Sequence, residues 1–154
     1  MIQVDTREHT SEWVRIMRQF DNMGIRYVRS KLYVGDYMSL DNARLVVDRK
    51  KDLLELCGNV CQQHDRFRAE LVRAQQADIQ IVILVEHGGD IRCLDDVAMW
   101  QNPRLRTSPG ATTGGQLYKA LGTLKKKYGV RYAFCDKTRT GEAIARILGE
   151  ARAP

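Results

Sequence analysis

Two aspartates, Asp36 and Asp48, stand in a stretch that is typical of two strands joined by a turn, VGDYMSLDNARLVVDRK at residues 34–50. The turn-forming residues lie at positions 41–43. A reversal there makes residues whose numbers sum to 84 face one another, so Asp36 faces Asp48. Directly opposed residues have Cβ atoms about 4.5–5.5 Å apart, and like charges at that distance are destabilising. The hairpin therefore needs a charge that compensates these two acids.

Side-chain alternation along the second strand brings Lys50 to the same face as Asp48 and turns Arg49 to the opposite face. Mg²⁺ commonly uses one or two protein carboxylates together with waters and substrate phosphate. Such an ion would offset the repulsion between the acids and polarise a phosphodiester. Lys50 would hold or deprotonate the attacking water, or stabilise the developing charge. The alternative is a surface hairpin with an Asp–Lys pair and one solvated aspartate.

A second charged group, Asp5 to Glu8, follows the predicted strand at residues 1–5. Active-site acids often lie at the exit of such a strand in α/β folds. The alternative for Glu8 is a charge at the start of a helix, where the helix dipole favours it.

Strands and helices alternate along the chain, which predicts an α/β class with a mixed sheet. Residues 79–86 are apolar enough for the centre of that sheet. Residues 102–115, rich in Pro, Gly, Ser and Thr, predict a mobile loop. The other predicted strands are residues 25–28, the hairpin arms and residues 130–134, and the predicted helices are residues 11–23, 53–63 (capped by Asp52), 65–77, 94–100, 116–129 and a last one from Thr140.

The bulk properties indicate one globular domain over residues 1–154, since 44% of the residues are hydrophobic and 29% are charged. A formal net charge of +6 favours a polyanionic partner. The longest apolar run, residues 81–85, is far shorter than the roughly 20 residues that span a membrane. Charges at residues 5–8 leave no room for an apolar leader, so we expect an intracellular, non-secreted protein of the cytoplasm or nucleoid, or of a host cytoplasm if a phage encodes it.

The four cysteines include no CxxC pair. Cys57, Cys61 and His64 could share one helical face as zinc ligands, but a fourth ligand has no evident position. Reduced cysteines that pack as small apolar residues are the favoured interpretation.

The order of these motifs resembles the nuclease domain of XPF-type structure-specific endonucleases, in the PD-(D/E)xK nuclease superfamily. The resemblance spans nearly the whole chain and implies a restriction-endonuclease-like three-layer sandwich, with a central mixed sheet flanked by helices. The segments that carry it are VDTRE (residues 4–8), GDY (35–37), VVDRK (46–50), IVILVE (81–86) and LKKKYGVRYAFC (124–135).

What the resemblance implies is cleavage of branched or flapped DNA near a duplex–single-strand junction, with Mg²⁺ as cofactor and Mn²⁺ as a substitute. It implies that the partner is DNA and that a homodimer is to be expected. The implied catalytic residues are Asp5, Asp36, Asp48, Arg49 and Lys50, and the implied metal ligands are Asp5, Glu8, Asp36 and Asp48.

Basic residues near the predicted site would track the DNA phosphates. The alternative for each is an exposed helix or loop charge. Trp13 could stack on a base, but its place on an amphipathic helix favours packing. The predicted DNA-binding residues are Arg7, Lys51, Arg66 and Arg68, together with Arg104 and Arg106 of the predicted mobile loop.

Two features depart from the family pattern. The family usually has Glu at the position of Asp48, and its later helix acid has no clean equivalent, since Asp52 and Glu55 do not match its spacing. XPF-type enzymes also generally carry a helix-hairpin-helix module after the nuclease domain, which we do not expect in this chain. A catalytically silent module that binds DNA or a protein partner, and a junction-resolvase-like nuclease, therefore stay open as alternatives.

Overall fold

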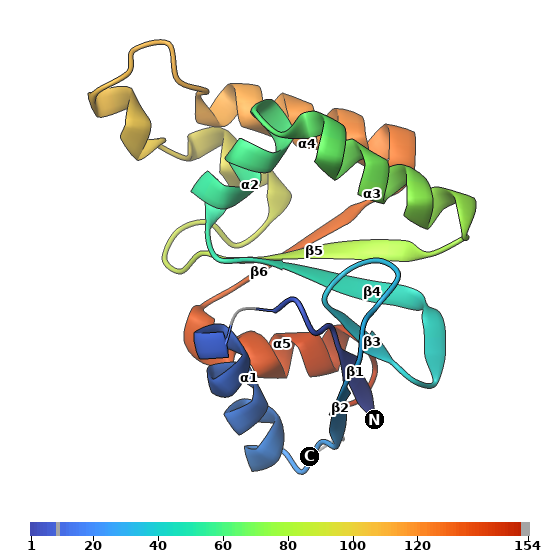
Figure 1. Cartoon of the computed structure of the whole chain (residues 1–154). Coiled ribbons are helices and arrows are strands. Elements are labelled where there is room, and N and C mark those ends of the chain that lie inside the picture. Colours follow the sequence, from blue (N-terminus) through green and yellow to red (C-terminus); the bar gives the residue numbers. More distant parts are fainter. Residues whose placement is uncertain (9, 152–154) are drawn as a thin grey trace.

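The computed structural model describes residues 1–8 and 10–151, and the strands of this part of the chain form one mixed sheet in the order β2-β1-β3-β4-β5-β6 (Figure 1). β4 and β5 are parallel, as are β5 and β6, whereas β3 runs antiparallel to both of its neighbours. The strands are β1 (Ile2–Val4), β2 (Tyr27–Arg29), β3 (Tyr37–Ser39), β4 (Asn42–Lys50), β5 (Gln80–Glu86) and β6 (Arg131–Cys135).

Helices cover both faces of the sheet, so the expected three-layer α/β sandwich is confirmed (Figure 1). One layer holds α1 and α5, and the other holds α2, α3 and α4. The α-helices are α1 (Thr10–Asn22), α2 (Leu53–Cys61), α3 (His64–Gln76), α4 (Gly114–Tyr128) and α5 (Thr140–Ile147), and short 3₁₀ helices are η1 (Leu94–Met99), η2 (Pro103–Arg106) and η3 (Lys137–Arg139).

β5 lies between β4 and β6 and contributes to both hydrophobic cores. Ile83 packs with the layer of α2, α3 and α4, while Leu84 packs with α1 and α5. Both side chains are fully buried. The continuous apolar segment of residues 79–86 is therefore a central strand, as predicted.

The hairpin of β3 and β4 has the predicted register close to the site, because Tyr37 pairs with Val47 and Met38 pairs with Val46. The turn differs from the prediction. It lies at residues 40–41 rather than 41–43, and Ser39 pairs with Asn42. A register shift between Met38 and Ser39 accommodates the extra residues of β4 and restores the expected pairing.

Local capping fixes two helix starts. The Asp52 carboxylate accepts the backbone N–H of Glu55 at 2.7 Å, so α2 begins where the sequence predicts. Thr113 and Gln116 form a capping box that starts α4 two residues before the predicted position. In the part of the chain that the structure describes, no helix has the length and apolar character to cross a membrane.

Candidate active site

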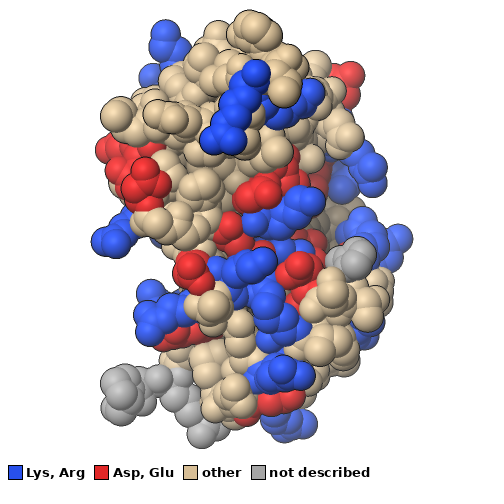
Figure 2. All heavy atoms as spheres, turned by 90° about the vertical axis from the view of Figure 1, so that its left-hand side faces the viewer, with Lys and Arg blue, Asp and Glu red and all other residues tan. Residues whose placement is uncertain are grey.

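A cavity of about 540 Å³ lies at the carboxyl end of β4, where the predicted acids and Lys50 meet. The carboxyl ends of β4 and β5 point toward one face of the molecule, and Figure 2 shows Lys, Arg, Asp and Glu side chains gathered across the middle of that face. The lining residues are Arg7, Glu8, Ser11, Glu12, Asp36, Asp48, Arg49, Lys50, Lys51 and Glu55.

Asp36 lies directly before β3, and its main chain is fixed from two sides. Its N–H donates to the carbonyl of Val47 at 2.8 Å, and its carbonyl accepts the N–H of Asp5 at 2.8 Å. The preceding Gly35 has φ +76°, and a Cβ there would lie 3.0 Å from the Val46 side chain. Only glycine fits this turn without strain, which explains the Gly-Asp sequence.

The side chain of Asp36 is half-buried, and its negative charge is unfavourable there because other carboxylates lie close to it. One carboxylate oxygen accepts the N–H of Arg49 at 2.8 Å, and the carboxyl group also shares a hydrogen bond with Asp48. Burial, the charge of Asp48 and the charge of Glu8 together raise the pKa of Asp36 well above its usual range. Two carboxyl groups this close favour retaining a proton, or binding a cation that replaces it.

Lys50 supplies the cation nearest to this pair. Its Nζ lies 3.4 Å from the Asp48 carboxylate and 5.4 Å from the centre of the Phe67 ring. Burial lowers the pKa of Lys50, but the charges of Asp48 and Asp36 outweigh that effect and raise it above the usual value. Lys50 is therefore an ammonium at neutral pH.

The donor set fits a hard divalent cation that uses two protein carboxylates. Asp36 and Asp48 would supply oxygen ligands, and waters with substrate phosphate commonly complete the shell of Mg²⁺. Over residues 1–8 and 10–151, no group of three or more His, Cys, Asp or Glu side chains is arranged to hold a metal ion. The protein therefore does not build an all-protein cage, and the expected set of four metal ligands is not assembled.

Asp5 is fully buried and serves the turn after β1. Its carboxylate accepts the N–H of Leu32 at 2.7 Å and the Nε–H of Arg7 at 2.7 Å. Burial raises the pKa of Asp5, but the hydrogen bonds from Arg7 and Leu32 outweigh it and leave the pKa below its usual value. Both oxygens of Asp5 accept hydrogen bonds within the protein, and Asp5 does not line the cavity of Asp36 and Asp48, so its role as a metal ligand stays a prediction.

Glu8 is likewise engaged within the protein. Arg49 donates to both of its oxygens, at 3.0 Å and 2.8 Å, and the Tyr37 hydroxyl donates at 2.8 Å. Glu8 lines the same cavity as Asp36, and its carboxylate is oriented by a buried guanidinium, so its role as a metal ligand stays a prediction.

Arg49 points to the face opposite Lys50, as the alternation of the strand predicts. Its side chain is 7% exposed and bridges Glu8 and Glu86, whose side chains are also buried. Arg15 of α1 donates to the other oxygen of Glu86 at 2.6 Å, and Thr140 of α5 also donates there. This set of charges, which we call the Arg49 network, ties β4 and β5 to α1 and α5. Arg49 thus lines the cavity and also holds this network together, and its predicted catalytic role stays a prediction.

The Arg49 network contains residues that the sequence analysis missed. Glu86 is the charged residue that directly follows the apolar run of residues 81–85, a signal that could have identified it. Arg15 gives no such signal, because it looks like an ordinary polar-face residue of α1.

The predicted DNA-binding residues fall into separate places. Arg7 and Lys51 line the cavity of the paired acids. Arg66 is exposed on α3, and Arg68 donates to the Tyr128 hydroxyl of α4 at 2.9 Å, in a groove between these helices. Arg68 is thus placed in the α3–α4 groove rather than at the cavity mouth.

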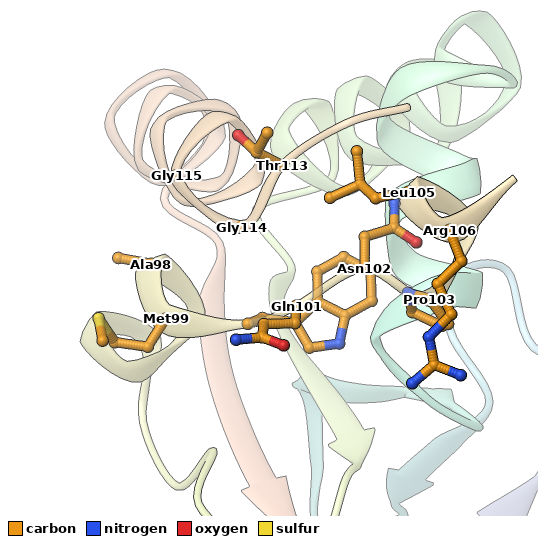
Figure 3. A pocket seen from close by; sticks show the side chains of 11 residues that line it. Ala98, Met99, Gln101, Asn102, Pro103, Leu105, Arg106, Thr113, Gly114 and Gly115 are labelled. Carbon is orange, nitrogen blue, oxygen red and sulfur yellow. The ribbon is translucent and has the colours of Figure 1, made fainter. Parts of the chain in front are cut away.

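The segment from residue 102 to 115 forms a second hollow region. Figure 3 shows Arg106 of η2 and Thr113 to Gly115 of the α4 start around a cavity of about 560 Å³. Arg104 lines a neighbouring cavity with residues of α2. The buried Asn102 donates to the carbonyl of Thr112 at 2.9 Å and so joins the two ends of the segment.

The structure places the remaining candidate residues away from catalysis. Cys57 is buried on α2, Cys61 is exposed, and His64 begins α3, where it contacts Asp65. These residues form no metal-binding group within the described residues, so the zinc alternative is not supported. Trp13 packs edge-on against Tyr27, in agreement with a packing role.

The mixed sheet flanked by helices on both faces is the fold of an XPF-type nuclease domain. Residues 4–147 match the ERCC4 domain, so the chain belongs to the ERCC4 domain family, a family of structure-specific DNA endonuclease domains. The predicted family resemblance is confirmed.

Solved structures of XPF from Aeropyrum pernix share the fold. One has 22% sequence identity and a TM-score of 0.67, and covers 96% of this chain and 62% of its own. A second, solved in complex with DNA, has 22% identity and a TM-score of 0.64, and covers 99% of this chain and 66% of its own. The chain thus spans less than two thirds of these relatives. A comparison with curated proteins finds no match.

Proposed function

We propose that this chain is a metal-dependent DNA endonuclease that hydrolyses phosphodiester bonds in branched, flap or fork DNA near duplex–single-strand junctions. The observation that carries the proposal is the meeting of Asp36, Asp48 and Lys50 in one cavity of an ERCC4 family member. The net charge of +6 supports a DNA partner. The A. pernix relative with the same fold was solved in complex with DNA, which supports the same partner.

Asp36 and Asp48 would hold the Mg²⁺ ion, with Mn²⁺ as a substitute. When bound, the ion would polarise the scissile phosphodiester. Lys50 is positively charged beside the acids, so its part is to orient a phosphate oxygen or the attacking water and to stabilise developing negative charge. This charge favours the electrostatic role over that of a base.

The surroundings assist in two ways. Arg7 and Lys51 at the rim of the cavity would contact phosphates on either side of the cleaved bond. Arg49 would keep β4 in place, so that Asp48 and Lys50 share one orientation. Asp48 has a shorter side chain than the Glu usual in the family, and it would be one of the two carboxylates that hold the ion.

A silent module that binds DNA or a protein partner is the second candidate. The observation that favours it is that, among the described residues, Asp36 and Asp48 are part of no group of three or more His, Cys, Asp or Glu side chains that could hold a metal ion. A junction-resolvase-like nuclease is a further candidate with the same chemistry. We also propose a homodimer, as the resemblance implies, and an intracellular location, as the sequence analysis expects.

A panel of labelled flap, fork, four-way junction and linear duplex substrates, each with Mg²⁺ or EDTA, separates these candidates. The proposal expects metal-dependent cutting of flap or fork DNA near the junction. Cutting of the four-way junction alone would favour a resolvase. Fork binding without any cutting would favour the silent module.

A further inference from the structure

Helix α3 contacts the turn that presents Asp36. The Oε1 atom of Glu70 accepts the backbone N–H of Gly35 at 3.0 Å. One helical turn further, the guanidinium of Arg73 lies 5.9 Å from the centre of the Tyr33 ring. α3 therefore contacts this segment at two points.

The turn at Gly35 has a particular need for such an acceptor. Pairing between β3 and β4 begins at Tyr37, so the N–H of Gly35 lies outside that ladder. Backbone N–H groups that are withdrawn from water require a partner. Gly35 forms this turn with φ +76° and is adjacent to Asp36. A movement of the turn therefore moves the Asp36 carboxylate directly.

The side chain of Glu70 is half-buried and close to the reacting groups. Burial and the charge of Asp48 raise its pKa, while the Gly35 N–H, Lys50 and Arg73 act to lower it. A carboxylate here is electrostatically unfavourable beside Asp48, whereas a neutral amide would accept the same hydrogen bond without that repulsion. The contact with Gly35 and the charge can therefore be separated by substitution.

We propose that Glu70 is a positioning residue, which aligns Asp36 in the metal site by accepting the N–H of Gly35. The inference rests on the proposed function, since it concerns the same metal site. Glu70 acts through the main chain of the turn, and its hydrogen-bond acceptor, not its charge, is what the site requires. Nothing in the sequence motifs assigns it this role.

The test compares Glu70→Gln, which keeps an acceptor oxygen, with Glu70→Leu, which has a similar volume and none. Gln76→Leu, at an exposed position of the same helix, controls for an added leucine. Two quantities are measured without DNA: hydrogen exchange of the Gly35 amide in EDTA, and the Kd for Mn²⁺ by calorimetry. Thermal melting establishes that each variant is folded.

We expect Glu70→Leu to exchange the Gly35 amide faster and to bind Mn²⁺ about 10-fold more weakly, the usual effect of losing an outer-shell contact. Glu70→Gln should stay within about 3-fold of the parent in both quantities. A Glu70→Leu protein that matches the parent would overturn the inference. So would a Glu70→Gln protein that loses Mn²⁺ affinity while Gly35 stays protected, because Glu70 would then act by its charge.

The inference and the proposed function can fail separately. If the parent binds Mn²⁺ and the variants behave as expected but no DNA is cut, the positioning role stands and the nuclease proposal fails. If the parent binds no metal, the nuclease proposal fails, and unchanged Gly35 exchange in Glu70→Leu would overturn the positioning contact as well.

Discussion

The carboxylate of Asp36 accepts the main-chain N–H of Arg49 at 2.8 Å, and this bond joins the turn before β3 to the residue between Asp48 and Lys50. The side chain of Asp36 is thereby held against Asp48 although both are acids. The repulsion between these two carboxylates destabilises the metal-free protein, and the first two predictions rest on it.

Replacement of Asp36 by Asn should stabilise the metal-free protein at neutral pH. The pKa of Asp36 in the folded state is raised above its usual value of 3.8, so the folded protein binds this proton more tightly than the unfolded chain. The free energy of unfolding of the metal-free protein therefore falls as the pH rises from below 3.8 toward the folded-state pKa of Asp36. This loss of stability persists above that pKa. Asn removes the loss, so Asp36→Asn should raise the Tm in EDTA at pH 7.5, by about 2–4 °C for each kcal/mol gained.

Calorimetric melting between pH 4 and pH 8 measures this difference. The gain should shrink toward low pH, where the parent is protonated. Asp41→Asn, in the exposed turn of the hairpin, should show no such gain. A lower Tm for Asp36→Asn at pH 7.5 would show that the acid pair is not repulsive.

With divalent metal bound, the parent should become more stable than Asp36→Asn. Mn²⁺ that binds only the folded protein stabilises it by about 2.7 kcal/mol at 100 times the Kd. The Tm of the parent should rise with Mn²⁺, and the rise should be lost in Asp36→Asn and Asp48→Asn. A Cys57→Ser, Cys61→Ser double variant should keep the full response. If it is the cysteine variant that loses the response, the metal binds elsewhere.

Replacement of Arg49 should lower the free energy of unfolding more than replacement of an exposed arginine. Arg49→Leu removes the buried cation that pairs with both Glu8 and Glu86, and breaking a buried pair in this way costs about 3–5 kcal/mol. Arg44→Leu, which breaks an exposed pair with Asp78, should cost about 0–1 kcal/mol. Urea unfolding measures both, and equal midpoints would mean that the Arg49 network does not support the fold.

We expect catalysis to require the positive charge of Lys50 rather than its action as a base. Lys50→Ala should lower the single-turnover cleavage rate by about 10²–10³-fold, the effect of removing one electrostatic donor. Lys50→Arg should keep part of the activity, since Arg is also a cation. If Lys50→Arg is as inactive as Lys50→Ala although folded and able to bind Mn²⁺, the lysine acts as a base.

Much of the fold follows from local patterns. The alternation of β4 predicts that Lys50 and Arg49 point to opposite faces, and Asp52 marks the start of α2. The register at Tyr37 and Val47 agrees with the prediction, although the prediction derived it from a turn at residues 41–43. The position of the turn was not predictable, because the register shift depends on how β4 pairs beyond it.

The partners of the charged residues could not be predicted, since they come from distant parts of the chain. Glu86 meets Arg49 across 37 positions, and Arg15 meets Glu86 across 71. The Asp5 carboxylate is occupied by the N–H of Leu32, which no side-chain pattern reveals. Motifs identified which acids gather near the site, but only the three-dimensional arrangement distinguishes those that face the cavity from those that hold it together.

The most direct test of the acid pair is the single-turnover cleavage rate of a labelled flap substrate by the parent, Asp48→Asn and Asp48→Glu. The account predicts cutting by the parent only with Mg²⁺ or Mn²⁺, a loss of about 10²-fold or more in Asp48→Asn, and retained cutting in Asp48→Glu. Cutting in EDTA, or an Asp48→Asn protein as fast as the parent, would contradict it.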